Sequence, residues 1–273
     1  MQGHIVTTDR LLRAMNAGEF EACIQPVVRT SDLRISGGEL LVRWHTPEGK
    51  IIPPARFIGQ VESAGLLPDM TCRLMLQAVN ALSGIKSVLP DDFRLAVNVT
   101  PALLTDSRFI QMCLTLAGEG KIRLVLELTE QRPFNADWQT AWKLALLNHS
   151  GVEIALDDFG TGCSVLSYLK HFPVSYIKMD KSFIQDILSE DLSRNIVESV
   201  VGLADRLGIG TVAEGVEVRE QVNCLSALGV DYLQGFYFGK PEKVSTFCCE
   251  YRQRQSCRPE NTPERTGLKR MMK

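Results

Sequence analysis

The chain has 273 residues, of which 45% are hydrophobic and 23% are charged, and its formal net charge is −2. This length suits one α/β barrel, which typically uses about 250 residues, or two smaller domains. The charge offers no basic surface to a nucleic-acid polymer, and no apolar run approaches the roughly 18 residues that a membrane-spanning helix needs, so we expect neither kind of partner.

The cysteines indicate the cellular compartment. The eight cysteines form no Cys-x-x-Cys pair and no Cys/His cluster, and most of them lie within apolar patterns. This usage favours free thiols in a reducing compartment over a disulfide framework. No signal peptide opens the chain. We therefore expect a cytoplasmic protein, or the cytoplasmic part of a longer, membrane-tethered one.

The N-terminal part predicts a short helix followed by two paired strands. Thr8 or Asp9 can cap the helix. The strands are expected at residues 20–28 and 33–44, and the turn between them is too short for the crossover that a parallel pair needs, so they should be antiparallel. The second strand holds Glu39 among apolar neighbours. Such a carboxylate has to be paired, bound to a cation or protonated.

From residue 54 onward, helical patterns alternate with short apolar strands. Six further strands are expected at residues 93–99, 122–128, 152–156, 174–179, 211–215 and 232–235. The helices are expected within residues 54–87, after Pro101, and at residues 138–147, 162–172, 192–207, 220–228 and 244–251. Apolar strands separated by helices indicate a mostly parallel sheet, and eight strands favour its closure as a (β/α)8 barrel.

The C-terminal residues break this pattern. Residues 252–273 contain seven Lys/Arg and two acidic residues, with no apolar periodicity. We interpret residues 1–251 as one domain and residues 252–273 as a basic, disordered tail.

Two adjacent acids, Asp157 and Asp158, end the strand at residues 152–156 and precede Gly160. Two carboxylates about 4 Å apart repel each other by roughly 4 kcal/mol at an effective dielectric near 20, so they need protons, a basic partner or a divalent cation. Taken alone, the pair favours an Asx turn at the strand end over a cation site. The Asp-Phe-Gly of a protein kinase is excluded, because the glycine-rich loop, the strand lysine and the His-Arg-Asp loop are missing.

Polar residues recur where the other strands end. The C-terminal strand ends of a (β/α)8 barrel share one face, which is where active sites lie. The polar residues at these ends are Glu39, Asn98, Glu127, Asp157, Asp158, Lys178, Glu214 and Gln234. Oxygen ligands without cysteine or histidine suit Mg²⁺ or Mn²⁺. The pattern therefore predicts a site for a hard divalent cation at the mouth of the barrel.

The same positions lie in motifs that resemble the EAL family of cyclic di-GMP phosphodiesterases. The motifs are, in chain order, GELLVRW, NVT, ELTE, DDFGTG, IKMD, AEGVE, QGF and GKP. The resemblance implies a modified (β/α)8 TIM barrel with its first strand antiparallel, which agrees with the tight hairpin. It also implies hydrolysis of cyclic di-GMP to linear pGpG, and a homodimer. The family's Glu-Ala-Leu motif is Glu39-Leu40-Leu41 in this chain. In a strand, the middle one of three residues points to the opposite face from the other two, so Leu40 should alter the packing behind the site.

The resemblance also implies residue roles. Two cations per active site, Mg²⁺ or Mn²⁺, would be held by Glu39, Asn98, Glu127, Asp157, Asp158 and Glu214, with Asp157 bridging them. Lys178, Glu214 and Glu39 would carry the catalysis. Because an ammonium among carboxylates should have a raised pKa, we favour an electrostatic role for Lys178 over that of a base.

Other residues are implied to contact the substrate or to support a loop. The implied substrate contacts are Gln25, Leu41, Arg43 and Gln234; Arg43 can fork onto a phosphate and the amides can read guanine edges. Glu130 is implied to anchor the loop after Asp158. Core packing would equally explain Leu41, and an exposed strand-end acid would equally explain Glu130.

Two other functions remain open at this point. One is a cyclic di-GMP receptor or protein-interaction module without activity, in which a missing cation ligand is expected. The other is an unrelated barrel enzyme that works through a metal-bound enolate, which does not account for the motifs around Gln25 and Gln234. The complete set of ligand residues favours the phosphodiesterase.

Overall fold

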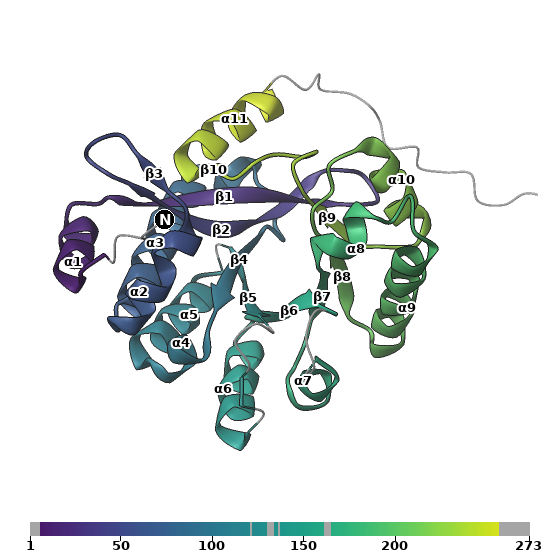
Figure 1. Cartoon of the computed structure of the whole chain (residues 1–273), viewed down its shortest axis with the longest axis horizontal. Helices are drawn as coiled ribbons and strands as arrows, with labels where there is room; N and C mark the ends of the chain where they lie inside the picture. Colours follow the sequence, from purple (N-terminus) through teal and green to yellow (C-terminus); the bar gives the residue numbers. More distant parts are fainter. Residues whose placement is uncertain (1–5, 121, 130–133, 136, 161–164, 257–273) are drawn as a thin grey trace, which may run out of the picture.

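The strands form one sheet that closes into a barrel, and helices surround most of it (Figure 1). The computed structural model describes residues 6–120, 122–129, 134–135, 137–160 and 165–256. The strands are β1 (Phe20–Arg29), β2 (Ile35–His45), β3 (Ile51–Ile52), β4 (Arg94–Val99), β5 (Arg123–Thr129), β6 (Glu153–Phe159), β7 (Tyr176–Met179), β8 (Gly210–Ala213), β9 (Tyr232–Gln234) and β10 (Glu242–Lys243).

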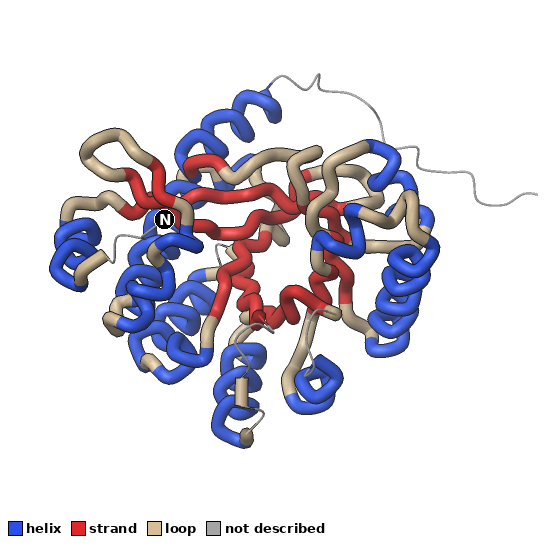
Figure 2. The backbone as a smooth tube through the Cα atoms, in the orientation of Figure 1, coloured by secondary structure: helices blue, strands red, loops and turns tan. Residues whose placement is uncertain are grey.

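The strand order confirms the predicted barrel. The closed ring, red in Figure 2, runs β1-β9-β8-β7-β6-β5-β4-β2 and returns to β1. Strand β1 is antiparallel to both of its neighbours, β2 and β9, whereas β2 and β4 to β9 are parallel to one another. The short strands β3 and β10 pair with β2 and β1, outside the ring. The fold is therefore a modified TIM barrel with an antiparallel first strand.

The helices agree with the sequence pattern, with some additions. They are α1 (Thr8–Asn16), α2 (Ile58–Ser63), α3 (Leu67–Ser83), α4 (Pro101–Thr105), α5 (Ser107–Glu119), α6 (Trp138–His149), α7 (Val165–His171), α8 (Lys181–Gln185), α9 (Asp191–Leu207), α10 (Arg219–Ala227) and α11 (Val244–Ser256), with 3-10 turns at Pro54–Arg56 and Lys86–Val88. Thr7, not Thr8 or Asp9, caps α1, because its side chain accepts from the Arg10 amide. Helix α8 was not expected from the sequence.

The hydrophobic core lies mainly between the barrel and its helices. On β4, Leu95 and Val97 join the main buried cluster, whereas Ala96, between them, joins a small separate cluster inside the barrel. This alternation follows from the two faces of a strand. Large apolar side chains thus anchor the helices, and the interior receives small and polar ones.

Two further observations bear on the sequence predictions. Helix α11 continues to Ser256, past residue 251, where we placed the end of the domain, and residues 257–273 lie outside the described part. The described cysteines are all free thiols, and Cys163 and Cys257 lie outside the described residues. Within the described residues, no helix has both the length and the hydrophobicity to span a bilayer.

Candidate functional site

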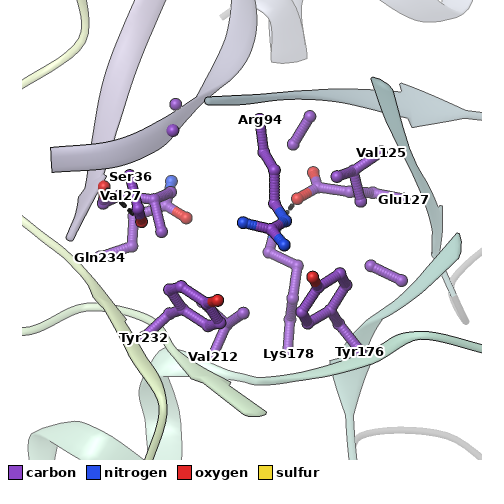
Figure 3. A pocket seen from close by; sticks show the side chains of 14 residues that line it. Val27, Ser36, Arg94, Val125, Glu127, Tyr176, Lys178, Val212, Tyr232 and Gln234 are labelled. Atoms are coloured by element: carbon purple, nitrogen blue, oxygen red, sulfur yellow. Dashed lines mark hydrogen bonds and ion pairs between the residues drawn. The ribbon is translucent and has the colours of Figure 1, made fainter. Parts of the chain in front are cut away.

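Aromatic and charged side chains, among them Arg94, Tyr176 and Tyr232, line a pocket inside the barrel (Figure 3). The guanidinium of Arg94 forms an ion pair with Glu153 (Nε to Oε2, 2.8 Å) and lies 5.6 and 5.8 Å from the ring centroids of Tyr176 and Tyr232. The Tyr176 hydroxyl also donates to Glu153 Oε1 at 3.2 Å. We call these residues the floor, because they cross the barrel at the N-terminal ends of its strands.

Small side chains above the floor leave room inside the barrel. This middle layer consists of Ala96, Val125 and Ala155. It lines a cavity of about 40 Å³, which the floor bounds on one side and Glu127, Lys178 and Gln234 bound on the other. Two residues farther along the strands of the middle layer, the inner face carries Asn98, Glu127 and Asp157. The barrel therefore becomes polar towards the C-terminal ends of its strands.

Lys178 lies at the centre of the polar residues at these strand ends. We call this set the rim; it consists of Glu39, Asn98, Glu127, Asp157, Asp158, Lys178, Glu214 and Gln234. Its Nζ is 2.6 Å from Glu214 Oε1, 2.7 Å from Glu127 Oε1, 3.1 Å from Asp157 Oδ1 and 4.0 Å from Glu39 Oε2. The lysine is only 2% exposed, and so is Glu127. These ion pairs join β7 to β5, β6, β2 and the residue after β8. The sequence prediction that these residues converge is therefore confirmed by their positions.

On the other side of the rim, side-chain amides form hydrogen bonds around Glu39. Glu39 accepts from Asn98 Nδ2 with one carboxylate oxygen (2.6 Å) and from Gln234 Nε2 with the other (2.7 Å). Gln234 Nε2 also lies 3.3 Å from Gln25 Oε1, and Gln25 Nε2 donates to the Gly239 carbonyl. Because β1 is antiparallel, Gln25 reaches the rim from within its strand, directly opposite Glu39. The antiparallel strand thus contributes a side chain to the same mouth.

A β-bulge explains how two consecutive acids reach one site. Successive residues of a regular strand point to opposite faces, which would turn Asp158 away from Asp157. The pairing of β6 with β7 shifts between Leu156 and Phe159, so Asp157 and Asp158 together lie opposite Lys178 alone. Asp158 has φ 55°, a left-handed conformation that is uncommon for a residue other than glycine. The extra residue and this φ angle bring both carboxylates to the rim.

Contacts around the bulge hold Asp158 in this conformation. Thr129 Oγ1 donates to Asp158 Oδ2 at 3.3 Å. Gly160 follows with φ 97°, and a Cβ added there would lie 2.9 Å from the ring of Phe183 in α8. A larger residue there would have to displace the ring and adopt a left-handed φ angle.

Replacing Gly160 by alanine should therefore be costly. A left-handed φ alone costs on the order of 1 kcal/mol or more for alanine, and the displaced Phe183 ring adds to this cost. Gly49→Ala is a matched control, since Gly49 has φ 77° with no atom within 4 Å of its Cβ position. We expect Gly160→Ala to lower the free energy of unfolding in urea by more than Gly49→Ala does. Equal losses would show that Phe183 does not support the turn.

Burial and mutual repulsion shift the pKa values of the rim. Burial raises the pKa of Glu127 well above its usual value and that of Glu214 to about 8, although Lys178 opposes both shifts. Burial and the neighbouring Asp157 raise the pKa of Asp158. Burial would lower the pKa of Lys178, but Asp157, Glu127 and Glu214 outweigh it and raise that pKa well above the usual value. The lysine therefore stays an ammonium, whereas the raised pKa values of Glu127, Glu214 and Asp158 show that these carboxylates are costly to ionise together without further positive charge.

The donor set of the rim fits a divalent cation. Carboxylate oxygens of Asp157, Asp158 and Glu214 lie within 4.8 Å of one another. Glu127 Oε2 is buried with no hydrogen-bond partner among the described residues. Buried carboxylates of this kind are normally paired or bound to a metal, and one lysine does not balance them. An all-oxygen set is the type that Mg²⁺ and Mn²⁺ prefer.

A pocket of about 280 Å³ opens beside these carboxylates. Its lining is Gln25, Glu39, Lys181, Gln185, Glu214, Gly215, Glu217, Gln234, Gly235 and Phe236. Gln25 and Gln234, predicted as substrate contacts, are thus on its wall. Leu41 and Arg43 do not line it; they lie farther along β2, where the Arg43 guanidinium donates to the Val42 carbonyl. Glu130 and residues 161–164 of the loop that it was predicted to anchor lie outside the described residues.

Sequence reasoning missed residues that support the acids from behind. They are Thr129, which donates to Asp158, and Phe183, whose ring packs beside Gly160. Sequence reasoning also missed Gln221, a buried residue that bonds the Ile184 carbonyl and the amides of Glu217 and Val218. Thr129 lies in the ELTE motif, but its hydrogen bond to Asp158 could not be predicted without knowledge of the bulge. Gln221 carries a recognisable signal, because a glutamine in the first turn of a helix often reaches back to the amides before it.

Comparisons with known proteins agree with this geometry. Residues 8–241 match the EAL domain. The cyclic di-GMP phosphodiesterase PdeL of Escherichia coli (strain K12) is 40% identical over 251 residues, which cover 91% of this chain and 69% of PdeL. The probable cyclic di-GMP phosphodiesterase PdeG of the same organism is 39% identical over 234 residues, covering 85% of this chain but 46% of PdeG.

Solved structures share the fold. The EAL enzyme Bd1971, in a form bound to cAMP and cyclic di-GMP, superposes with a TM-score of 0.81 at 30% identity and covers 89% of this chain and 67% of that one. The PaMucR phosphodiesterase in complex with c-di-GMP gives a TM-score of 0.79 at 30% identity, over 88% and 98% of the two chains. Since the matched region contains every strand of the closed ring and the whole polar rim, the chain belongs to the EAL domain family.

Proposed function

We propose that this chain is a metal-dependent phosphodiesterase that hydrolyses cyclic di-GMP to linear pGpG. The observation that carries the proposal is the convergence of Glu39, Glu127, Asp157 and Glu214 on Lys178 at the mouth of an EAL-family barrel. The names of its relatives support the same substrate, since PdeL is named a cyclic di-GMP phosphodiesterase and PaMucR was solved with c-di-GMP.

The residues that would hold Mg²⁺ or Mn²⁺ are those of the rim. We assign Glu39, Asn98, Glu127 and Asp157 to one cation, and Asp157, Asp158 and Glu214 to a second, which agrees with the close approach of the last three side chains. When bound, such cations would acidify the attacking water and neutralise charge on the phosphodiester. Asn98 would offer its amide oxygen, while its Nδ2 keeps the hydrogen bond to Glu39.

The chain's own residues would orient the attacking water and stabilise the negative charge on the phosphate. Water attacks phosphorus, the new P–O bond forms, and the bond to the 3′ oxygen breaks, so that the 3′ oxygen leaves as a hydroxyl and a 5′-phosphate remains. Lys178 is held as an ammonium by its carboxylate partners, so it would offset negative charge at the phosphate and would not serve as a base. Glu214 and Glu39, which line the pocket and lie 2.6 and 4.0 Å from Lys178 Nζ, would orient the water and the cations.

The substrate would lie in the pocket beside the rim. Gln25 and Gln234 line that pocket with amides that can read guanine edges. Arg43 and Leu41 extend the same side of β2 and would contact the more distant part of a dinucleotide. We retain Glu130 as the proposed anchor of the loop after Asp158.

The oligomeric state and location belong to the same proposal. We propose a homodimer; Trp138 and Trp142, one turn apart on α6, are 75% and 60% exposed, and exposed aromatic side chains are typical of interaction surfaces. The free thiols of the described cysteines support a reducing, cytoplasmic compartment. We keep the proposal of a basic C-terminal tail, with its start moved from residue 252 to residue 257 because α11 runs to Ser256.

One experiment tests the activity directly. Purified protein incubated with cyclic di-GMP and either Mg²⁺ or Mn²⁺ should produce pGpG, detected by chromatography, and an excess of chelator should stop the reaction. Binding of cyclic di-GMP without product at any cation concentration would instead identify a receptor. If the protein neither bound cyclic di-GMP nor formed pGpG, the proposed EAL-type function would be wrong.

A further inference from the structure

Helix α8 lies against two turns that follow rim acids. It is a short helix after β7, and Asp180 caps it by accepting from the Ser182 amide at 2.9 Å. On one side, the Phe183 ring fills the space beside Gly160, in the turn after Asp158. On the other side, Lys181 fills the space beside Gly215, the residue after Glu214.

The turn after Glu214 is enclosed on both sides. A Cβ added to Gly215, which has φ 73°, would lie 2.5 Å from Lys181 Cβ. Across the turn, the Val216 amide donates to the Gln234 carbonyl at 3.0 Å, and a Cβ added to Gly235 would lie 2.2 Å from the Val216 nitrogen. The backbone that carries Glu214 therefore depends on where α8 lies.

A single buried amide connects α8 to this turn. Gln221, in the first turn of α10, is 5% exposed. Its Nε2 donates to the Ile184 carbonyl of α8 at 2.9 Å, and its Oε1 accepts from the amides of Glu217 and Val218 at 2.8 and 3.1 Å. Because both ends of the side chain are used, the amide fixes the distance between the helix and the segment that follows Glu214.

We propose that Gln221 is a positioning residue for the cation site, acting through α8 and the residue 215–218 segment on Glu214 and Asp158. The inference rests on the proposed function, because it assumes that the rim binds a divalent cation. Gln221 does not line the pocket beside the rim, so it would act through the segments that it connects. Residues that orient ligands from behind typically change metal affinity by about 10- to 100-fold when they are replaced.

The test measures cation affinity in the whole chain. Gln221→Met keeps the length of the side chain and removes all three hydrogen bonds. We expect the dissociation constant for Mn²⁺, measured from the free-Mn²⁺ signal in electron paramagnetic resonance titrations, to rise by about 10-fold or more. Hydrolysis of cyclic di-GMP should fall at low Mn²⁺ and return towards the parental rate when Mn²⁺ is raised to saturation. A folding defect alone would not be reversed in this way.

A second variant separates the two ends of the amide. Gln221→Glu keeps the acceptor for the Glu217 and Val218 amides but cannot donate to the Ile184 carbonyl. It should raise the Mn²⁺ dissociation constant by less than Gln221→Met does. If Gln221→Met does not fold, Gln221→Glu decides the question, and parental Mn²⁺ affinity in this variant would overturn the proposal.

Gln77→Met is the control for a glutamine away from the cation site; unlike Gln221, Gln77 is exposed. Gln77 also bonds backbone through both ends of its amide, with the Ala22 amide (3.1 Å) and the Phe20 carbonyl (3.5 Å), but it lies on α3. The Gln77→Met variant should leave the Mn²⁺ affinity unchanged. An equal loss of Mn²⁺ affinity in Gln77→Met and Gln221→Met would overturn the proposal. Parental affinity in folded Gln221→Met would also overturn it, while the proposed function would stand. If the unaltered chain bound no Mn²⁺, the proposed function and the inference would fail together.

Discussion

Replacing Glu39 by glutamine is expected to abolish hydrolysis of cyclic di-GMP while binding of cyclic di-GMP survives. The two oxygens of Glu39 accept from Asn98 and Gln234, so a glutamine must turn its own NH₂ group towards one of these donors. The change also removes one negative charge from the proposed cation site. Losing several kcal/mol of transition-state stabilisation of this kind corresponds to a rate reduction of roughly 1,000-fold.

The measurements are turnover at saturating Mn²⁺ and cyclic di-GMP binding by calorimetry. Glu153→Gln is the matched control, because it makes the same isosteric change in the same barrel, at the floor beside Arg94. We expect that control to lower stability and to retain turnover. A Glu39→Gln protein that hydrolyses cyclic di-GMP at the parental rate would remove Glu39 from the site.

Replacing Lys178 by methionine should produce the largest change in stability. In the absence of cations, Lys178 is the ion-pair partner of Glu127, Asp157 and Glu214, which would all be left buried beside an apolar side chain. Breaking a buried pair in this way costs about 3–5 kcal/mol. Added Mn²⁺ should reduce the deficit, because the proposed cations also supply positive charge. Hydrolysis should remain strongly impaired, since the ammonium would no longer face the phosphate.

Urea denaturation in chelator and in Mn²⁺ would measure both effects. Lys243→Met is the control: its Nζ is 2.9 Å from Glu21, but the lysine side chain is 51% exposed, and exposed ion pairs contribute only about 0–1 kcal/mol. If Lys178→Met in chelator were as stable as the parent, Lys178 would not be the counter-charge of the rim.

The sequence predicted the strands and the rim because both depend on local patterns. Each barrel strand is a short apolar run, and the polar residue at its end has to lie on the common face once the sheet closes. The antiparallel first strand followed from a turn too short for a crossover. These inferences needed no knowledge of which side chains touch.

What the sequence did not predict depends on contacts between distant segments. Helix α8 is too short to show helical periodicity, and it is stabilised by its packing between Gly160 and Gly215. The bulge at Asp158 contradicts the simple alternation of a strand. Gln221 is a polar residue in the first turn of α10, and the sequence does not show that its side chain is buried or that it reaches Ile184 of α8. The extent of α11 beyond Tyr251 was missed because its last residues carry no apolar stripe.

The bulge also has an evolutionary consequence. Leu156 pairs with Ile177 and Phe159 with Met179, so one residue on β6 is surplus to a regular ladder. An in-frame loss of that single codon would let the two strands pair continuously, and would take one carboxylate from the mouth of the barrel. We therefore expect a deletion of one codon to remove a carboxylate from the proposed second cation site, which Asp157, Asp158 and Glu214 share.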